Sequence, residues 1–295
     1  MSRVIHGLGE PMKLLRYGPK GREKPGLLDD DGAIRDLSKV VKDLGGDALS
    51  PAGLKKLKKL KPEKLKKVPG KPRLGMPVSP IGKLICVGLN YADHAAEAGA
   101  KIPEEPVLFV KTPNTYAGPN DRLVFPRGAS KMDWEVELAI VMGRRARYVT
   151  KENALKYVAG YTICNDVSER AFQIERGGSQ WIKGKFCDGF APLGPWLVTA
   201  DEVQDPQKLG LWCAVNGTRM QNGNTSTMIF DCAHLVSYIS DFITLEPGDV
   251  IITGTPPGVG LGKKPPVFLN PGDVVTLGID GMGTQTQTCV APANR

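Results

Sequence analysis

The sequence lacks the features that would place the protein in a membrane, outside the cell or in a zinc-binding class. No apolar run reaches the roughly 18 residues that a membrane-spanning helix needs. Residues 1–11 lack the apolar stretch of a secretory signal. The six cysteines stand singly, with no Cys-x-x-Cys pair, which excludes a zinc ribbon and a thioredoxin-like motif. We therefore expect a cytoplasmic protein with no membrane partner and no disulfide framework.

Common signatures of nucleotide and serine-hydrolase chemistry are also missing. The loop TGTPPGVG at 253–260 has no Gly-Lys-Ser/Thr and does not open a helix. It is therefore neither a phosphate-binding P-loop nor a dinucleotide fingerprint. No Gly-x-Ser-x-Gly elbow occurs in the chain. The loop does offer threonine hydroxyls, Thr255 among them, and backbone N–H groups that can hold an anion.

The formal net charge of +8 comes mostly from one segment. Residues 54–67, LKKLKKLKPEKLKK, hold eight lysines and one glutamate, without arginine or aromatic residues. Arginine and aromatic side chains are the groups with which proteins read nucleic acid or stack on it. The leucines instead predict short amphipathic helices, broken near Pro62, with a solvated lysine face. We expect no nucleic-acid partner. The alternative is a non-catalytic binding protein that uses this segment to hold nucleic acid or an acidic partner.

The remaining composition favours strands over helices. With 35 glycines and 24 prolines in 295 residues, the chain suits a turn-rich β architecture with a large core. We predict a mainly β protein with some helix (α+β), and one clear helix over 229–242. Prolines and glycines crowd 69–80, which indicates a junction between a small domain at 1–75 and a larger one at 76–295. Strands are expected at 12–17, 84–87, 107–111, 135–142, 161–165, 196–199, 211–216, 250–253 and 274–279.

Three turns are also predicted. Asn216-Gly217 between two extended runs is typical of a hairpin. The segments 246–250 and 270–274 both contain Pro-Gly-Asp-Val, and each is expected to lead into an apolar strand.

The segment DWEVELAIV at 133–141 is the most informative part of the chain. Side chains alternate along a strand, so Glu135 and Glu137 project from one face among apolar neighbours. Two carboxylates are costly to bury together, and a hard divalent cation such as Mg²⁺, Mn²⁺ or Ca²⁺ would resolve the repulsion. The alternative is a solvent-facing strand surface paired with lysines. Asp166, at the end of an apolar strand, would add a third ligand, or it could cap a helix over 167–173.

Further candidates suit a carboxylated substrate. In the helix expected over 167–173, Arg170 and Gln173 share one face, where a cation and an amide would bind a carboxylate. An ordinary surface helix is the alternative. Lys185 follows a Gly-Gly loop and could neutralise an enolate or a carboxylate.

Histidine is scarce, with three in the chain. His6 lies in a tail that we expect to be disordered, and His234 falls on the apolar face of the 229–242 helix, which indicates a core position. His94 lies in a polar segment with Glu97 three positions on, close enough for a hydrogen bond that raises the basicity of the imidazole. This is the arrangement of a general base acting on water. The alternative is a surface His-Glu pair.

Taken together, these segments resemble the fumarylacetoacetate hydrolase family over about residues 80–285. Five motifs occur in the family's order: GLNYADHAAE (88–97), DWEVELAIV (133–141), NDVSERAFQ (165–173), GKFCDGF (184–190) and ITGTPPGVG (252–260). The resemblance implies a mixed β-sandwich roll, a variable N-terminal domain before about residue 75, and a homodimer. It also implies Mg²⁺ or Mn²⁺ held by Glu135, Glu137 and Asp166, with Ca²⁺ as a non-native occupant.

There are two departures from the family's pattern. The chain reads GKFCD at 184–188 where members often read Gly-Lys-Ser-Phe-Asp, and the fourth acidic ligand of the founding hydrolase has no assigned counterpart.

The resemblance also implies roles for the other candidate residues. His94 and Glu97 would activate water or transfer a proton, and Lys185 would hold the substrate. Arg170, Gln173 and Thr255 would orient the substrate's carboxylate and carbonyl.

The expected function follows from this resemblance. Water activated by His94 would cleave a C–C bond of a small acylpyruvate or 2,4-diketo acid, while the metal stabilises a pyruvate-like enolate leaving group. A 2,4-diketo-3-deoxy sugar acid is one expected substrate, since similar members serve bacterial sugar-acid and aromatic catabolism. The same scaffold also supports oxaloacetate-type decarboxylation and isomerisation of 2-hydroxy-diene-dioates.

Overall fold

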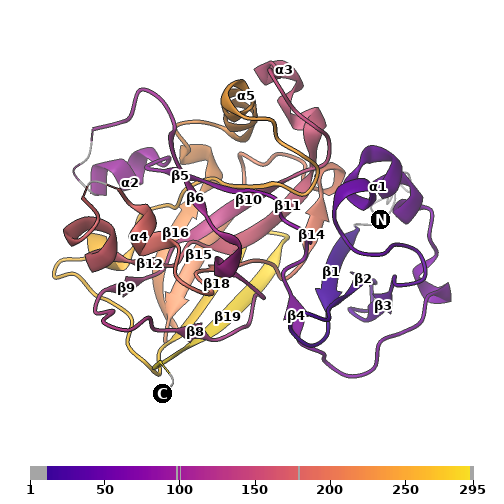
Figure 1. The fold of residues 1–295 in the computed structure, drawn as a ribbon, viewed down its shortest axis with the longest axis horizontal. Coiled ribbons are helices and arrows are strands. Elements are labelled where there is room, and N and C mark those ends of the chain that lie inside the picture. The colour runs from indigo at the N-terminus through magenta and orange to yellow at the C-terminus, as the bar shows by residue number, and fades with distance from the viewer. Residues whose placement is uncertain (1–11, 98, 100, 179, 293–295) are drawn as a thin grey trace, which may run out of the picture.

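A large mixed sheet runs through most of the molecule (Figure 1). The computed structural model describes residues 12–97, 99, 101–178 and 180–292. Across the ten-stranded sheet the order is β3 (Ile34–Asp36), β2 (Lys24–Leu28), β1 (Lys13–Tyr17), β14 (Leu197–Thr199), β11 (Val158–Asn165), β10 (Val136–Met142), β17 (Val250–Ile252), β5 (Leu84–Gly88) and β6 (Val107–Lys111), and β4 (Leu74–Gly75) pairs with β1.

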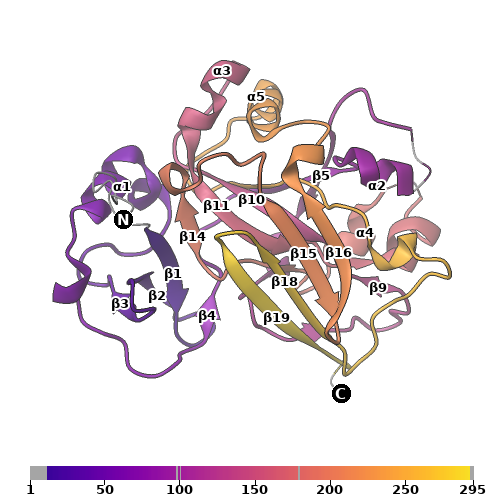
Figure 2. The ribbon, with the colours of Figure 1, turned by 180° about the vertical axis from the view of Figure 1, so that it is seen from behind.

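A second sheet packs against the middle of the first, and the main apolar core lies between the two (Figure 2). Its order is β16 (Thr218–Asn224), β15 (Gly210–Val215), β18 (Val274–Ile279), β19 (Gly283–Val290) and β8 (Leu123–Val124). Two short pairs complete the strands: β12 (Ser168–Glu169) with β9 (Met132–Asp133), and β13 (Ala191–Pro192) with β7 (Tyr116–Ala117). The predicted mainly β, α+β class is confirmed.

Helices are few and mostly short. They are α1 (Pro51–Lys58), α2 (Ala92–Glu97), α3 (Lys151–Ala154), α4 (Ile182–Lys185) and α5 (Cys232–Phe242). The helix predicted over 229–242 begins at Cys232, because the Asp231 side chain accepts a hydrogen bond from His234 N at 2.7 Å and caps the first turn. None of the helices in the described ranges has both the length and the hydropathy that a membrane span requires.

The core position predicted for His234 is wrong. Its ring is half-buried and stacks between Phe230 and Tyr238, with ring centroids 5.1 and 5.9 Å away. Phe230 precedes α5, and His234 and Tyr238 lie four apart within it, whereas Leu235 and Ile239 form its buried face. His6 lies outside the described residues.

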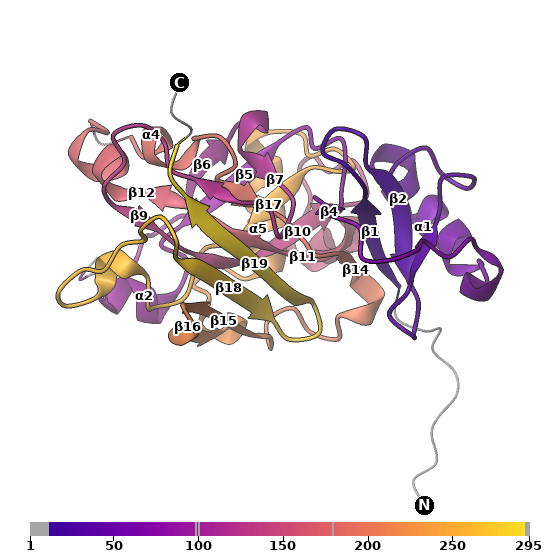
Figure 3. The same ribbon diagram turned by 90° about the horizontal axis from the view of Figure 1, so that it is seen from below.

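The N-terminal elements extend the large sheet without a break, at one end of the molecule (Figure 3). β1 pairs antiparallel with β14, and Lys13 lies opposite Val198. Leu14 and Leu27 belong to the same apolar cluster as Val141 of β10. The boundary at residue 75 therefore does not interrupt the sheet, and it stays a prediction.

The first part of the lysine segment lies in a short amphipathic helix, as predicted, but no second α-helix follows within the described residues. α1 ends at Lys58, and a separate 3₁₀ turn begins at Pro62. Leu57 is 2% exposed and joins the core beneath the helix. All the lysines of residues 54–67 are exposed.

β10 is buried on both faces, and this determines where its carboxylates point. One face packs toward the five-stranded sheet, and the other packs toward the N-terminal unit. The face toward the five-stranded sheet carries Val136, Leu138 and Ile140, and the face toward the N-terminal unit, the second set, carries Ala139 and Val141. Glu137 shares the parity of the second set, and Glu135 precedes the strand with the same parity. At the start of β10, carboxylates thus replace the apolar side chains of this face.

The helix predicted over 167–173 is wrong. Residues 168–169 are extended as β12, and a single π-helical turn follows at Ala171–Glu175. The reason is Glu169, whose carboxylate accepts hydrogen bonds from the N–H groups of Ser130, Lys131 and Phe172 at 2.9, 2.7 and 2.6 Å. Glu169 therefore holds β12 beside β9 and caps the next turn. The alternative of Asp166 as an N-cap is wrong as well.

Candidate metal centre and substrate cavity

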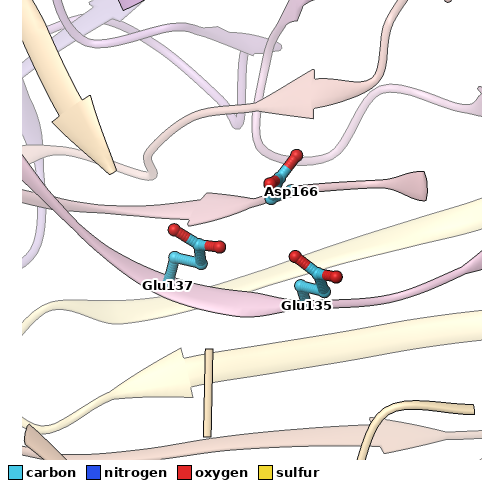
Figure 4. A group of neighbouring side chains, drawn as sticks. All are labelled: Glu135, Glu137 and Asp166. Carbon is cyan, nitrogen blue, oxygen red and sulfur yellow. The ribbon is translucent and has the colours of Figure 1, made fainter. Parts of the chain in front are cut away.

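Three buried carboxylates converge where β10 and β11 lie side by side (Figure 4). The antiparallel register places Val136 opposite Asn165, and Asp166 N donates to Glu135 O at 2.9 Å. Glu135 and Glu137 rise from one face of their strand toward Asp166. One carboxylate oxygen of each lies within 4.8 Å of the others. The three candidate metal ligands thus form one cluster, although they come from two motifs.

Two predicted residues place cations directly against this cluster. Lys185 Nζ lies 2.8 Å from both Glu135 Oε2 and Asp166 Oδ2, so its ammonium group bridges the two carboxylates. Arg170 Nη2 lies 2.7 Å from Glu135 Oε1. Burial alone would lower the pKa of Lys185, but the charges of Asp166 and Glu135 outweigh it and raise the pKa. Lys185 therefore stays protonated at neutral pH.

A third cation, Lys111, was not predicted. It ends the apolar strand β6, is 2% exposed, and donates to Val167 O at 3.0 Å and Phe190 O at 2.6 Å. Its Nζ lies 2.7 Å from Asp166 Oδ1, at angles too poor for a hydrogen bond, so this contact is an ion pair. A lysine at the end of an apolar run was the available signal in the sequence.

Replacing Lys111 with methionine is expected to destabilise the metal-free protein by about 3 kcal/mol. The change keeps most of the length of the side chain but leaves the buried Asp166 carboxylate without one of its counter-charges. Urea unfolding in EDTA would measure the loss. The exposed Lys156→Met variant is the control, with an expected change of about 0.5 kcal/mol or less. Equal stability of both variants would contradict a charge-balancing role.

The two glutamates of β10 differ in their electrostatic environment. For Glu135, burial acts to raise the pKa, but the charges of Lys185 and Arg170 outweigh it and lower the pKa to about 2. For Glu137, burial and the charges of Asp166 and Glu135 raise the pKa well above its ordinary value. Glu137 Oε2 accepts from Gly254 N at 2.7 Å, and no described lysine or arginine forms an ion pair with it. The donor set, three oxygens with one charge uncompensated, fits a hard divalent cation.

Without metal, the protein is expected to lose stability as the pH rises above about 5. The folded state holds a proton on Glu137 that the unfolded chain releases above its ordinary pKa of 4.5, so raising the pH favours unfolding. Glu135, with a pKa of about 2, is ionised in both states over this range and adds no slope. Urea unfolding at several pH values in EDTA would measure the trend.

Glu137→Gln is the matched control for this pH dependence, because glutamine cannot titrate. The stability of the Glu137→Gln variant in EDTA should vary less over the same pH range. Added Mn²⁺ should stabilise the unchanged protein most at the highest pH values tested. A wild-type protein whose metal-free stability rises over this range would contradict the account.

Asp133 links Arg170 to the loop that follows β17, a role that the sequence analysis missed. Its Oδ2 accepts from Arg170 Nε at 2.8 Å and Leu261 N at 3.0 Å, and its Oδ1 accepts from Gly260 N at 2.7 Å. Arg170 Nη1 also donates to Gln173 Oε1 at 2.9 Å. Arg170 and Gln173 therefore lie together as the predicted spacing implied, although the predicted helix is not present.

His94 and Glu97 form the predicted pair on α2. His94 Nδ1 lies 3.1 Å from Glu97 Oε2, and both side chains are partly buried. Gly258 N donates to both Glu97 oxygens, at 3.0 and 3.1 Å. Gly262 packs so closely that a Cβ there would lie 2.7 Å from Glu97 Cδ, which only glycine permits without rearrangement. The 258–262 loop therefore fixes the carboxylate that orients the imidazole.

All the predicted site residues line one cavity of about 480 Å³. A cavity of this size suits a small molecule. The residues are His94, Glu97, Glu135, Glu137, Asp166, Arg170, Gln173, Lys185 and Thr255.

Thr255 lies in the cavity wall with its hydroxyl already engaged. It donates to Val136 O at 2.9 Å and accepts from Gln221 Nε2 at 2.7 Å. Its hydroxyl proton thus serves the protein's own backbone in this structure, and a direct substrate contact of Thr255 stays a prediction.

An apolar wall, which the sequence analysis did not predict, faces the same cavity. Phe109 and Trp181 meet edge to face, with ring centroids 5.9 Å apart, and Ile174 and Val87 lie beside them in the lining. Gly88 makes room for this, because a Cβ there would lie 2.3 Å from the Trp181 ring. The cavity therefore combines a charged floor with an apolar side.

The chain is similar to known proteins along nearly its whole length. The model of the fumarylacetoacetate (FAA) hydrolase C-terminal domain matches residues 83–290. A curated relative from Burkholderia ambifaria, named "Putative hydrolase", is 60% identical over 278 residues, which is 94% of this chain and 98% of the relative.

Solved structures show the same likeness. A fumarylacetoacetate hydrolase from the psychrophilic Exiguobacterium antarcticum is 36% identical with a TM-score of 0.82, over 95% of this chain and 100% of that chain. A 2-hydroxyhepta-2,4-diene-1,7-dioate isomerase from Mycobacterium marinum is 33% identical with a TM-score of 0.72, over 96% of this chain and 100% of that chain.

The fold and the site together define a β-sandwich scaffold with a buried carboxylate centre at the base of a small-molecule cavity. The chain belongs to the fumarylacetoacetate hydrolase family. The resemblance inferred from the five sequence motifs is thereby confirmed.

Proposed function

We propose that the protein is a divalent-metal-dependent hydrolase that cleaves a C–C bond of a small acylpyruvate or 2,4-diketo acid. The observation that carries the proposal is one cavity lined by both the carboxylate cluster and the His94–Glu97 pair. Membership of the family supports the choice of a hydrolase. The proposal includes a cytoplasmic homodimer whose ligand is the small acid itself.

The carboxylate cluster would hold Mg²⁺ or Mn²⁺ through Glu135, Glu137 and Asp166. When bound there, the ion supplies Lewis-acid stabilisation of the negative charge that develops on the substrate's enolate oxygen. Lys185 stays protonated beside the cluster and offers N–H donors to an anionic oxygen. Arg170, fixed by Asp133, adds a second donor group for the substrate carboxylate.

His94 is proposed as the general base. A hydrogen bond from Nδ1–H to Glu97 leaves Nε2 as the acceptor, and Gly258 N holds the Glu97 carboxylate in place. Nε2 takes a proton from water as the water oxygen bonds to the distal carbonyl carbon. The C–C bond then breaks, and its electron pair passes to the pyruvate fragment. The proton returns from His94 to the carbon of the pyruvate fragment that held the broken bond, which yields pyruvate and a carboxylic acid.

Isomerisation of a 2-hydroxy-diene-dioate is the second candidate, and decarboxylation of an oxaloacetate-type acid is the third. The isomerase alternative is favoured by the 33% identity to the isomerase from Mycobacterium marinum. An isomerase would need His94 to move a proton between carbons, with no water attack.

The test is turnover of a substrate panel after EDTA treatment and after addition of Mg²⁺ or Mn²⁺. The panel holds acylpyruvates, a 2,4-diketo-3-deoxy sugar acid, oxaloacetate and a 2-hydroxy-diene-dioate. Metal-restored release of pyruvate plus an acid supports the hydrolase. Carbon dioxide from oxaloacetate alone, or an isomer without cleavage, would replace it with the decarboxylase or the isomerase.

A further inference from the structure

Two lysines of the cavity lining have no part in the proposed reaction. Lys263 and Lys264 follow the loop that contacts Glu97, and both line the cavity. Lys263 is half-buried, and its Nζ donates to Met220 O at 3.3 Å. In the part of the chain that the structure describes, neither lysine forms an ion pair with a carboxylate. Their charges are therefore available to a ligand.

Along the chain, these lysines follow the part of the loop that contacts the His94–Glu97 pair. Gly254 N contacts Glu137, at the carboxylate cluster. Further along the loop, Gly258 N contacts Glu97, and Gly262 packs against the same carboxylate. Lys263 and Lys264 come next. The loop thus passes from the carboxylate cluster to the His-Glu pair and then to the lysines.

The charge balance of the two ends of the cavity favours a substrate with two anionic groups. At the carboxylate cluster, four carboxylates meet three cations once Glu137 is ionised, so a bound divalent cation would leave one net positive charge. At the other end, the lysines outnumber Glu97 by two to one. Both ends of a metal-loaded cavity would then be positive. The four carboxylates counted at the carboxylate cluster are Asp133, Glu135, Glu137 and Asp166, and the three cations are Lys111, Arg170 and Lys185.

We propose that Lys263 and Lys264 form a second anion subsite, which binds a carboxylate at the far end of the substrate's acyl group. The preferred substrates are then dianionic 2-oxo or 2,4-diketo acids with a short apolar chain between the two anionic ends. Phe109 and Trp181 provide the apolar wall along which that chain lies. The direction of the acyl group rests on the proposed function, because it assumes that the 2-oxo acid end lies at the carboxylate cluster.

The test compares 2-oxoglutarate with 2-oxopentanoate, in which a methyl group replaces the terminal carboxylate, and extends to 2-oxoadipate with 2-oxohexanoate. Calorimetric titration of each acid into the Mn²⁺-loaded protein measures binding without any turnover. The dianion of at least one pair should bind roughly 10-fold more tightly, the ratio expected for one partly screened ion pair. In the Lys263→Met/Lys264→Met variant the two acids of each pair should bind equally.

The control is Lys55→Met/Lys59→Met, which removes the same charge from exposed positions in α1 and at its C-cap and should keep the full preference. Equal binding of both acids in every pair by the unchanged protein would overturn the subsite, as would a preference that survives in the Lys263/Lys264 variant. A preference without any hydrolysis of the panel would leave the subsite standing and refute the proposed reaction. Hydrolysis without a preference would do the reverse.

Discussion

Replacing Glu137 with glutamine is expected to abolish metal binding and turnover together while leaving the fold intact. Glutamine has the same shape but lacks the negative charge that Glu137 offers a metal, and no described lysine or arginine forms an ion pair with Glu137. Loss of a bound Lewis acid removes several kcal/mol of transition-state stabilisation, so turnover should fall by roughly 10³-fold or more. Bound Mn²⁺, measured on the purified protein, and the rate of pyruvate release would be determined in the same samples.

The Glu137→Gln result needs a control for stability, because many buried substitutions unfold proteins. This one removes the cost of holding a proton on Glu137 beside two other buried carboxylates, so the metal-free variant should melt no lower than the metal-free parent. Glu152→Gln, at an exposed glutamate, is the matched control and should keep both metal and activity. Full turnover by Glu137→Gln without bound metal would refute the metal centre.

Strands with apolar, alternating sequences were predictable, and polar strands were not. The bounds expected for 107–111 and 274–279 agree with β6 and β18, and the Asn216-Gly217 hairpin is present, with positive φ at both residues. β19, with the sequence GTQTQTCV, was missed because its buried side chains include amides. The Gln285 amide, for example, donates to the carbonyl oxygens of Ile163, Pro192 and Gly194, partners that lie far away in the sequence. Burial of such a strand depends on tertiary hydrogen bonds that local patterns do not contain.

The carboxylate cluster was predictable because much of its geometry follows from local strand periodicity. The common face of Glu135 and Glu137 follows from the period of a strand, and the pairing of β10 with β11 brings Asp166 to them. Asp133 and Lys111 were not predicted, since each acts through partners on distant segments. The failed helix at 167–173 has the same origin. Its pattern is helical, but Glu169 binds the backbone of residues 130 and 131 and holds the chain extended.

Replacing His94 with alanine is expected to slow turnover by roughly 10²-fold or more while metal binding persists. The imidazole lies in the cavity with the carboxylates but does not belong to their cluster, so its loss should leave Mn²⁺ bound. His234→Ala is the matched control, because this histidine lies on α5 and does not line the cavity, and its rate should stay within about two-fold of the parent. Steady-state rates and bound Mn²⁺ would be measured for both variants.

Glu97→Gln separates the role of the imidazole from that of its partner. Glutamine can still accept from Gly258 N, but it cannot stabilise the charge of a protonated His94, so an intermediate loss of rate is expected. The ordering of rates, parent above Glu97→Gln above His94→Ala, is what a base oriented by a carboxylate predicts. Unchanged turnover in His94→Ala would mean that another group activates the water, and the His94–Glu97 pair would then serve only to hold the 258–262 loop over the cavity.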